Sequence, residues 1–375
     1  MNTSTGSCRW RPGVVVLLAW LALTRFASAD ETDNFYLPLN ANFADLGDFL
    51  EAIHTKAIEE GVRVVNNRIE RALNKKDPAT RAKVLAQCHA PDPLAEVVVD
   101  QFGSRLTETM RIERALQGAW ARQSFPDKTV IHSDISMNLR GHSTLDPRAL
   151  LMLFQAGTIR AFGVYFGTDK VLHFHQLGYR YYTRYRSLLR SGRSPDEARE
   201  EVLRHFGAEA LLAEDNGFGT ITTGIFSNAD MAANNAGFKF FLNLTEPIVF
   251  LGHKREPLVV RCGLFWRVND LVRPQSGWFG AFISDHWNEA LNPNLYDSSM
   301  RPHIQRILQD RACQIVEFYT RKDHRPQDPA YYDNLARTLA TQEGEPYGHS
   351  GQLEQLMTIG NTCLPAMQEA ESKGH

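Results

Sequence analysis

The chain has 375 residues, of which 43% are hydrophobic and 22% are charged. This composition is that of an ordinary folded protein and excludes disordered, collagen-like and low-complexity chains. Lys and Arg together number 41 against 43 Asp and Glu, so no basic excess indicates a nucleic-acid partner. The length accommodates one large domain or two modest ones.

The first 29 residues have the layout of a secretory signal peptide. Two arginines precede an apolar run at residues 14–23, and the small residues 27–29 form a cleavage pattern before Asp30. The apolar run is shorter than the roughly 20 residues that a membrane-spanning helix needs. We therefore expect an exported protein, periplasmic or extracellular, with an uncleaved membrane anchor as the alternative.

Four cysteines follow this segment, an even number in a chain expected to reach an oxidising compartment. We expect one or two disulfides, and four cysteines allow three complete pairings between which the sequence does not decide. No C-x-x-C motif occurs, which argues against a thioredoxin-like or zinc-ribbon site. The four are Cys88, Cys262, Cys313 and Cys363.

Helical patterns dominate the rest of the chain. Apolar residues at helical spacing predict helices over residues 48–74 and 93–122. Ser194 and Ser227 each begin a capping box, a signature of helix N-termini. Start signals and spacing together predict further helices over residues 146–166, 168–190, 194–212, 227–244, 301–319 and 329–342.

Strand patterns are few. Residues 258–261 and 264–268 predict a short hairpin, and residues 220–226 are a weaker candidate. Charged residues interrupt the apolar stretches at 150–166 and 238–251, so neither is expected to span a membrane. The predicted fold class is mainly α, a soluble helical bundle with at most a small β-hairpin.

The expected organisation has four parts. A signal peptide (1–29) precedes a helical domain (30–254), which is followed by a turn-rich, aromatic insertion or subdomain (255–302). Helices in residues 303–375 are expected to pack on the main domain. No internal repeat is visible.

Two segments on consecutive predicted helices carry polar residues that share a helix face. In the first, Asp169 and His173 lie four positions apart, with Lys170 beside that face, whereas His175 falls elsewhere on the helix. A carboxylate next to an imidazole orients the ring and raises its basicity.

The second segment places Asp230, Asn234 and Gly237 on one face of the later helix. Its Ala and Gly residues allow a neighbouring helix to approach closely. Glu214 lies sixteen residues before Asp230, between the two segments.

The order D-K-x-x-H-F, then a Glu, then S-x-x-D-x-x-A-N-x-x-G resembles the VanZ-like family and its smaller relatives, the YfiM-type envelope lipoproteins. The resemblance covers residues 166–241 and implies a bundle of short helices whose polar residues converge; some members are linked to glycopeptide resistance. The matching residues are Asp169, Lys170, His173, Phe174, Glu214, Asp230, Asn234 and Gly237. VanZ-like helices span the membrane, whereas the first segment here continues into Arg180, Arg184, Arg186 and Arg190.

Two interpretations of these residues remain open. In the structural one, Asp230 caps its helix and His173 is a core histidine within a paired polar network. In the functional one, Asp169 orients His173 as general base or metal ligand, and Lys170 holds an anion or an oxyanion. Glu214 and Asp230 would then supply further carboxylates.

Other candidates lie outside these segments. The basic and aromatic stretch 179–186 could contact a membrane surface, although an amphipathic core helix explains it as well. Asp285, His286 and Glu289 gather charged groups in the turn-rich region, where a structural turn is the simpler reading.

We therefore expect an exported helical cell-envelope protein whose partner is an envelope component or a membrane surface. Its polar centre is expected to be structural or ligand-binding and contains His173, Asp169, Lys170 and Asn234. The rival is a hydrolase or lytic enzyme on an envelope glycan or lipid, using His173 with Asp169, Glu214 or Asp230. An enzyme needs His173 within about 3–5 Å of a carboxylate and facing an open cleft. The sequence specifies no cofactor and no metal.

Overall fold

The computed structural model describes residues 41–103, 105–132, 156–204, 225–296, 298, 300–342, 345–346 and 355–373. The predicted signal peptide, the first part of the helix expected at 146–166, and Glu214 lie outside these described residues.

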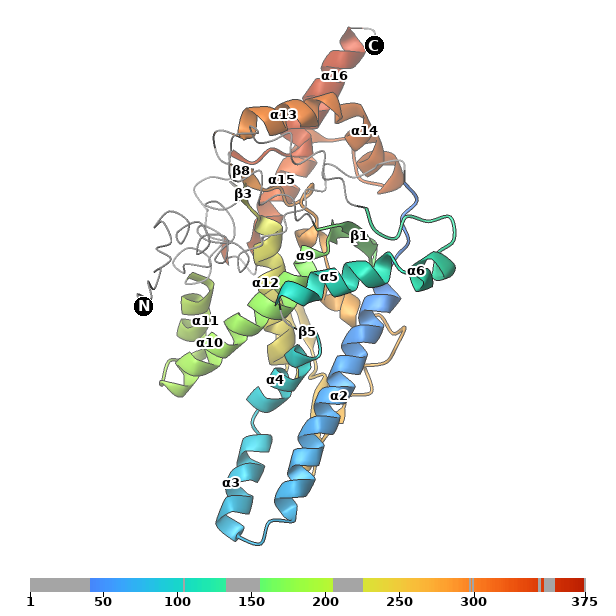
Figure 1. Cartoon of the computed structure of the whole chain (residues 1–375). Helices are drawn as coiled ribbons and strands as arrows, with labels where there is room; N and C mark the ends of the chain where they lie inside the picture. Colours follow the sequence, from blue (N-terminus) through green and yellow to red (C-terminus); the bar gives the residue numbers. More distant parts are fainter. Residues whose placement is uncertain are drawn as a thin grey trace, which may run out of the picture.

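The described chain is mainly helical, as predicted (Figure 1). None of its helices combines the length and apolar composition that a membrane crossing requires. Three π-helical turns, His173–Leu177, Phe318–Lys322 and Ile359–Cys363, accompany the α-helices. The α-helices are α2 (Gly47–Leu73), α3 (Pro78–Cys88), α4 (Asp92–Asp100), α5 (Arg105–Leu116), α6 (Ala119–Ser124), α9 (Asp169–Leu172), α10 (Gly178–Arg190), α11 (Pro195–Arg204), α12 (Asn228–Asn243), α13 (Arg301–Asp310), α14 (Ala312–Glu317), α15 (Pro329–Leu339) and α16 (Leu364–Ser372).

The described residues form five two-stranded antiparallel pairs, more than the single hairpin expected. The predicted hairpin is present, with Val259 opposite Val268 and Cys262 opposite Phe265. The pairs are β1 (Thr158–Ala161) with β2 (Val164–Gly167), β3 (Ile225–Phe226) with β8 (Leu295–Tyr296), β4 (Ile248–Phe250) with β5 (His253–Arg255), β6 (Val259–Cys262) with β7 (Phe265–Val268), and β9 (Thr341–Gln342) with β10 (Glu345–Pro346).

Two predicted helices are wrong in part. The helix expected to run to residue 166 is replaced at its end by the β1–β2 hairpin, because Phe162 and Gly163 both adopt positive φ and turn the chain back. The helix expected over 93–122 is broken into α4, α5 and α6, and Gly103 at φ 91° separates the first two. The helix expected over 48–74 is confirmed as α2.

Buried apolar side chains form two clusters in the described chain. The larger one joins α2, α4, α10 and α12 with the aromatic segment around residues 279–287. The smaller one lies among α13, α14, α15 and α16. Figure 1 shows the α2–α3 pair projecting at one end of the molecule and α16 at the other.

Helix α10 faces the core with its tyrosines and the solvent with its arginines. Tyr181 and Tyr182 are buried, and Arg186 bonds to Asp92 and Glu246. This arrangement is that of an amphipathic core helix, the simpler of the two readings of residues 179–186.

None of the four cysteines described is disulfide-bonded. Cys88 and Cys363 are buried in the apolar clusters, whereas Cys262 and Cys313 are exposed. The expected disulfides are therefore not part of this structure.

Two glycines bring the backbones of two helices into direct contact. A Cβ on Gly237 of α12 would lie 1.8 Å from the carbonyl oxygen of Phe174, and one on Gly178 would lie 2.6 Å from the backbone of Gly237. The π-helical turn His173–Leu177 lies at this crossing. The crossing therefore sets how α9 and the start of α10 sit against α12.

We predict that Gly237→Ala lowers the free energy of unfolding by about 3 kcal/mol or more, because the added methyl group meets backbone that cannot rotate away. Gly61→Ala is the matched control. Its methyl group would meet the buried Val98 side chain at 2.7 Å and no backbone atom closer than 3.8 Å, so we expect a smaller loss. Urea unfolding of both variants checks the difference, and equal losses would contradict the account.

Candidate functional site

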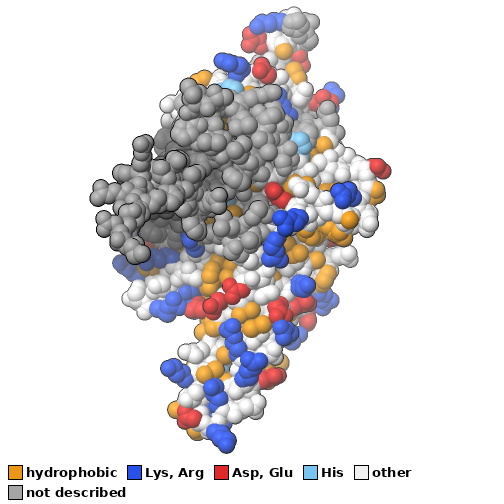
Figure 2. All heavy atoms as spheres, viewed as in Figure 1, with side chains coloured by type: hydrophobic (Ala, Val, Ile, Leu, Met, Phe, Trp, Pro, Cys, Tyr) orange, Lys and Arg blue, Asp and Glu red, His pale blue; other side chains and the backbone are white. Residues whose placement is uncertain are grey.

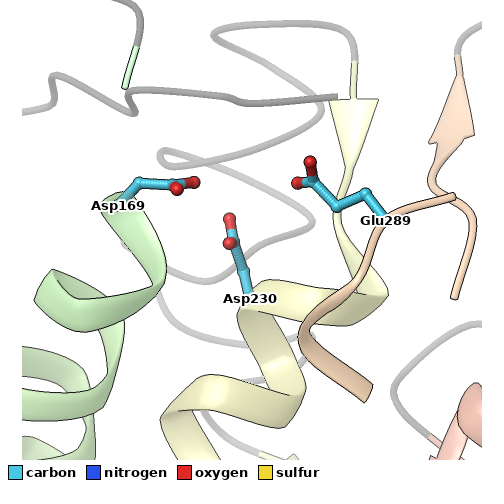
Figure 3. Close-up of side chains that lie close together, drawn as sticks. All are labelled: Asp169, Asp230 and Glu289. Carbon is cyan, nitrogen blue, oxygen red and sulfur yellow. The ribbon is translucent and has the colours of Figure 1, made fainter. Parts of the chain in front are cut away.

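The ammonium group of Lys170 lies between three carboxylates. Its Nζ is 2.7 Å from Asp169 Oδ2, 2.6 Å from Asp230 Oδ1 and 2.6 Å from Glu289 Oε1. All four side chains are at most 2% exposed. Figure 3 shows the three carboxylates pointing toward one another from three separate elements. These residues and His173 are called the Lys170 cluster below.

Asp169 and Lys170 open α9 directly after the β1–β2 hairpin. The preceding residue, Thr168, is fully buried and donates its hydroxyl to Glu113 of α5 at 2.7 Å. The same carboxylate oxygen accepts from the backbone of Gly157 at 2.7 Å. Glu113 therefore fixes the base of the hairpin, and with it the start of α9.

Asp230 lies in the first turn of α12. The Ser227 hydroxyl accepts a hydrogen bond from the backbone N–H of Asp230 at 3.1 Å, which is the serine half of the predicted capping box. Its carboxylate reaches both Lys170 and His173, at 2.6 and 3.2 Å. Helix capping and the cluster thus use the same residue.

Glu289 enters from the turn that follows the 3₁₀ turn Asp285–Trp287. Asn288 holds this turn, since its side-chain oxygen accepts from Ala290 N at 3.0 Å and from the Tyr319 hydroxyl at 3.3 Å. The β3–β8 pair joins the chain just before α12 to residues 295–296. Together these contacts bring Glu289 to the N-terminal end of α12.

His173 is held through both ring nitrogens. Its Nδ1 lies 3.0 Å from Asn234 Oδ1, and its Nε2 lies 3.2 Å from Asp230 Oδ2. An amide oxygen only accepts, so Nδ1 donates to Asn234. A proton must then lie between Nε2 and Asp230, because two lone pairs would otherwise face each other.

The cluster carries more carboxylates than cations. With every carboxylate ionised, a charged Lys170 and a protonated His173 still leave it one negative charge in excess. Burial raises the pKa of Asp169, the neighbouring Lys170 opposes that rise, and Asp230 adds to it. The Oδ1 atom of Asp169 has no hydrogen-bond partner among the described residues. Asp230 Oδ1 also lacks a hydrogen bond of good geometry, although it lies 2.6 Å from Lys170 Nζ, so the raised pKa is what favours Asp169 as the carboxyl group that holds the remaining proton.

The structure brings together five of the six predicted site residues, Asp169, Lys170, His173, Asp230 and Asn234; Glu214 is the sixth and lies outside the described residues. The member that the sequence did not connect to them is Glu289, which had been grouped with His286. The structure separates those two: the His286 ring contacts the Ser284 hydroxyl at 3.0 Å instead. The repeated asparagines around Glu289 are the feature of the sequence that could have indicated this buried turn, because asparagine side chains form hydrogen bonds with the backbone of turns.

His175 belongs to a different buried pair, which fits its predicted place on another helix face. Its Nε2 lies 2.7 Å from Nε2 of His54, a residue that no pattern in the sequence indicated. His54 Nδ1 donates to the Leu50 carbonyl at 2.6 Å, so its Nε2 accepts and His175 donates. Both rings are fully buried and neutral, and they stack on Phe279 and Phe102 at centroid distances of 3.6 Å.

Oxygens of Asp169, Asp230 and Glu289 lie within 4.8 Å of one another, close enough to share a metal ion. The Lys170 ammonium already lies within 2.7 Å of all three carboxylates. The residues present therefore fit an internal cation better than a metal centre.

No family model matches the chain, and neither a curated protein nor a solved structure is significantly similar to it. The resemblance to the VanZ-like and YfiM-type families stays a prediction from residues 166–241.

We predict that Lys170→Met lowers the free energy of unfolding by about 3–5 kcal/mol, because the buried carboxylates of Asp230 and Glu289 lose their counter-ion and Asp169 loses a hydrogen-bond donor. Arg184→Met is the matched control, since the Arg184–Glu201 pair is 43% and 23% exposed and should contribute under about 1 kcal/mol. Denaturant unfolding measures both. A Lys170→Met loss no larger than that of the control would show that the cluster does not hold the fold.

The buried histidine pair predicts a loss of stability in acid. Burial lowers the pKa of His175 to about 3 and, with His175 beside it, lowers the pKa of His54 well below its usual value. Below about pH 6.5 the unfolded chain binds these protons and the folded one does not. Stability should therefore fall from pH 6.5 toward pH 3, with His175 contributing about 2 kcal/mol between pH 7 and pH 5.

Thermal unfolding between pH 7 and pH 5 tests this. His175→Gln should flatten the pH dependence, whereas His253→Gln, at an exposed histidine, should leave it unchanged. Equal slopes in the two variants would refute the assignment.

Proposed function

We propose that this chain is an exported, mainly helical protein of the cell envelope that acts by binding, and that the Lys170 cluster is the internal charge network that holds its fold. The observation that carries the proposal is the burial of one ammonium group among three carboxylates from three elements. Such a network ties distant parts of a chain together in one arrangement.

Burial also argues against catalysis at the cluster. A general base must reach a substrate, whereas His173 is 5% exposed and both of its nitrogens contact protein atoms. A cavity of about 400 Å³ lined by described residues lies elsewhere, and none of its lining residues belongs to the cluster. The distance that an enzyme would need, from His173 Nε2 to Asp230 Oδ2, is present, but the cavity that the described residues line at α2 and α5 does not reach it.

The resemblance to VanZ-like and YfiM-type proteins supports the assignment to the cell envelope. It rests on a shared order of residues, and the matching positions are Asp169, Lys170, His173, Asp230 and Asn234. The signal-like segment 1–29 supports export. In this proposal the shared motif encodes a way of packing two helices, and its polar residues serve a buried charge balance.

The experiment compares Asp169→Asn with Asp230→Asn. Asparagine imitates a protonated Asp169, so we expect Asp169→Asn to change stability by less than about 1 kcal/mol. Asp230 is the charged partner of both Lys170 and His173, so Asp230→Asn should lower stability by about 3 kcal/mol. Unfolding curves at pH 7 give both values.

The same proteins are incubated with cell-wall glycan and with phospholipid vesicles, and the soluble products are measured by mass spectrometry. We expect none above the blank. Products formed by the wild-type chain and lost in a folded Asp169→Asn variant would overturn the proposal in favour of a hydrolase that uses His173 and Asp169.

A further inference from the structure

An open cavity of about 400 Å³ lies between α2, the end of α4 and the C-terminal half of α5. This volume is in the range of sites that hold small molecules. Its mouth is open to solvent, because the lining includes the exposed side chains of Lys56 and Arg111. Figure 2 shows hydrophobic side chains next to Lys and Arg side chains in the region of α5.

The floor of the cavity is apolar. Phe49, Ile53 and Ala57 follow one another at four-residue spacing and so line it along one face of α2. Ile112 of α5 and Phe102 close the other side. The result is a short apolar channel along the helix, which suits a hydrocarbon chain better than a compact polar solute.

The rim of the cavity is cationic. Lys56 and Arg111 both belong to its lining, and none of the described lining residues is acidic. The Arg111 guanidinium is held over the cavity by a 3.4 Å hydrogen bond from Nη1 to the carbonyl of Phe102. Two cations above an apolar channel are complementary to a molecule with one anionic head and one chain.

Ring contacts with neighbouring residues hold two of the aromatic side chains that line the cavity. Phe102 stacks on the buried His175 ring, and Phe49 packs against Trp120, whose ring centroid lies 5.0 Å away. Trp120 is 45% exposed and extends the apolar surface beyond Phe49. A ligand would meet preformed walls, which lowers the ordering cost of binding.

We propose that this cavity binds a single-chain anionic amphiphile, with its head group at Lys56 and Arg111 and its chain along Phe49, Ile53 and Ala57. The inference rests on the proposal that the protein acts by binding, and it names the class of ligand. It uses no residue of the Lys170 cluster.

The test titrates the full chain with dodecanoate below its micelle concentration at 0.15 M salt, and follows heat by calorimetry and Trp fluorescence. We expect saturable binding with one dodecanoate per chain. Lys56→Glu/Arg111→Glu should weaken it at least tenfold but change the binding of neutral dodecanol less than twofold. Ala115→Trp, which fills the cavity from an exposed lining position, should abolish both.

Arg71→Glu/Arg114→Glu is the matched control, because it makes the same total charge change on α2 and α5 at exposed residues outside the lining; we expect less than a twofold effect. Absence of saturable binding to the folded protein, or binding that survives Ala115→Trp, would overturn the inference. So would pelleting with phosphatidylglycerol vesicles without dodecanoate binding, which would indicate a membrane surface instead. None of these results would alter the stability measurements at the Lys170 cluster, which test the proposed function separately.

Discussion

The described structure depends on the balance of charge around one buried lysine. Lys170 has no contact with bulk water, and its ammonium group is shared by carboxylates from α9, α12 and the turn after residues 285–287. Removing a cation from water is expensive, and only short contacts to opposite charges offset that loss. The elements that carry Asp169, Asp230 and Glu289 must therefore stay in one relative position, and the glycine contact between α10 and α12 lets two of them approach.

Much of this centre could be predicted from local sequence. Asp169, His173, Asp230 and Asn234 were grouped correctly because helical spacing and a serine cap define their faces before any tertiary contact exists. Glu289 could not be joined to them, because its position depends on the Asn288 turn and the β3–β8 pair, which connect residues far apart in the chain. His54 was missed for the same reason: its partner is 121 positions away.

The mainly helical character was predictable, whereas only some of the element boundaries were. Apolar spacing gave α2 within one residue at each end, because a long amphipathic helix carries its own signal. The end of the helix expected at 146–166 became the β1–β2 hairpin, where the Phe162–Gly163 turn and the Thr168–Glu113 bond override the helical pattern. Among the short strand pairs, the sequence indicated the β6–β7 hairpin, whereas the other pairs of two to four residues carry too little pattern to be recognised.

The account assigns two tasks to two places. We propose that the Lys170 cluster and the His54–His175 pair hold the core and that the cavity beside α2 and α5 binds a ligand. The most direct test of the central claim is a double-mutant cycle with Lys170→Met and Glu289→Leu, followed by denaturant unfolding. The account predicts a coupling free energy of about 2–3 kcal/mol between these residues. Effects that add to within about 0.5 kcal/mol would contradict it, because two independent side chains cannot be the shared anchor of the fold.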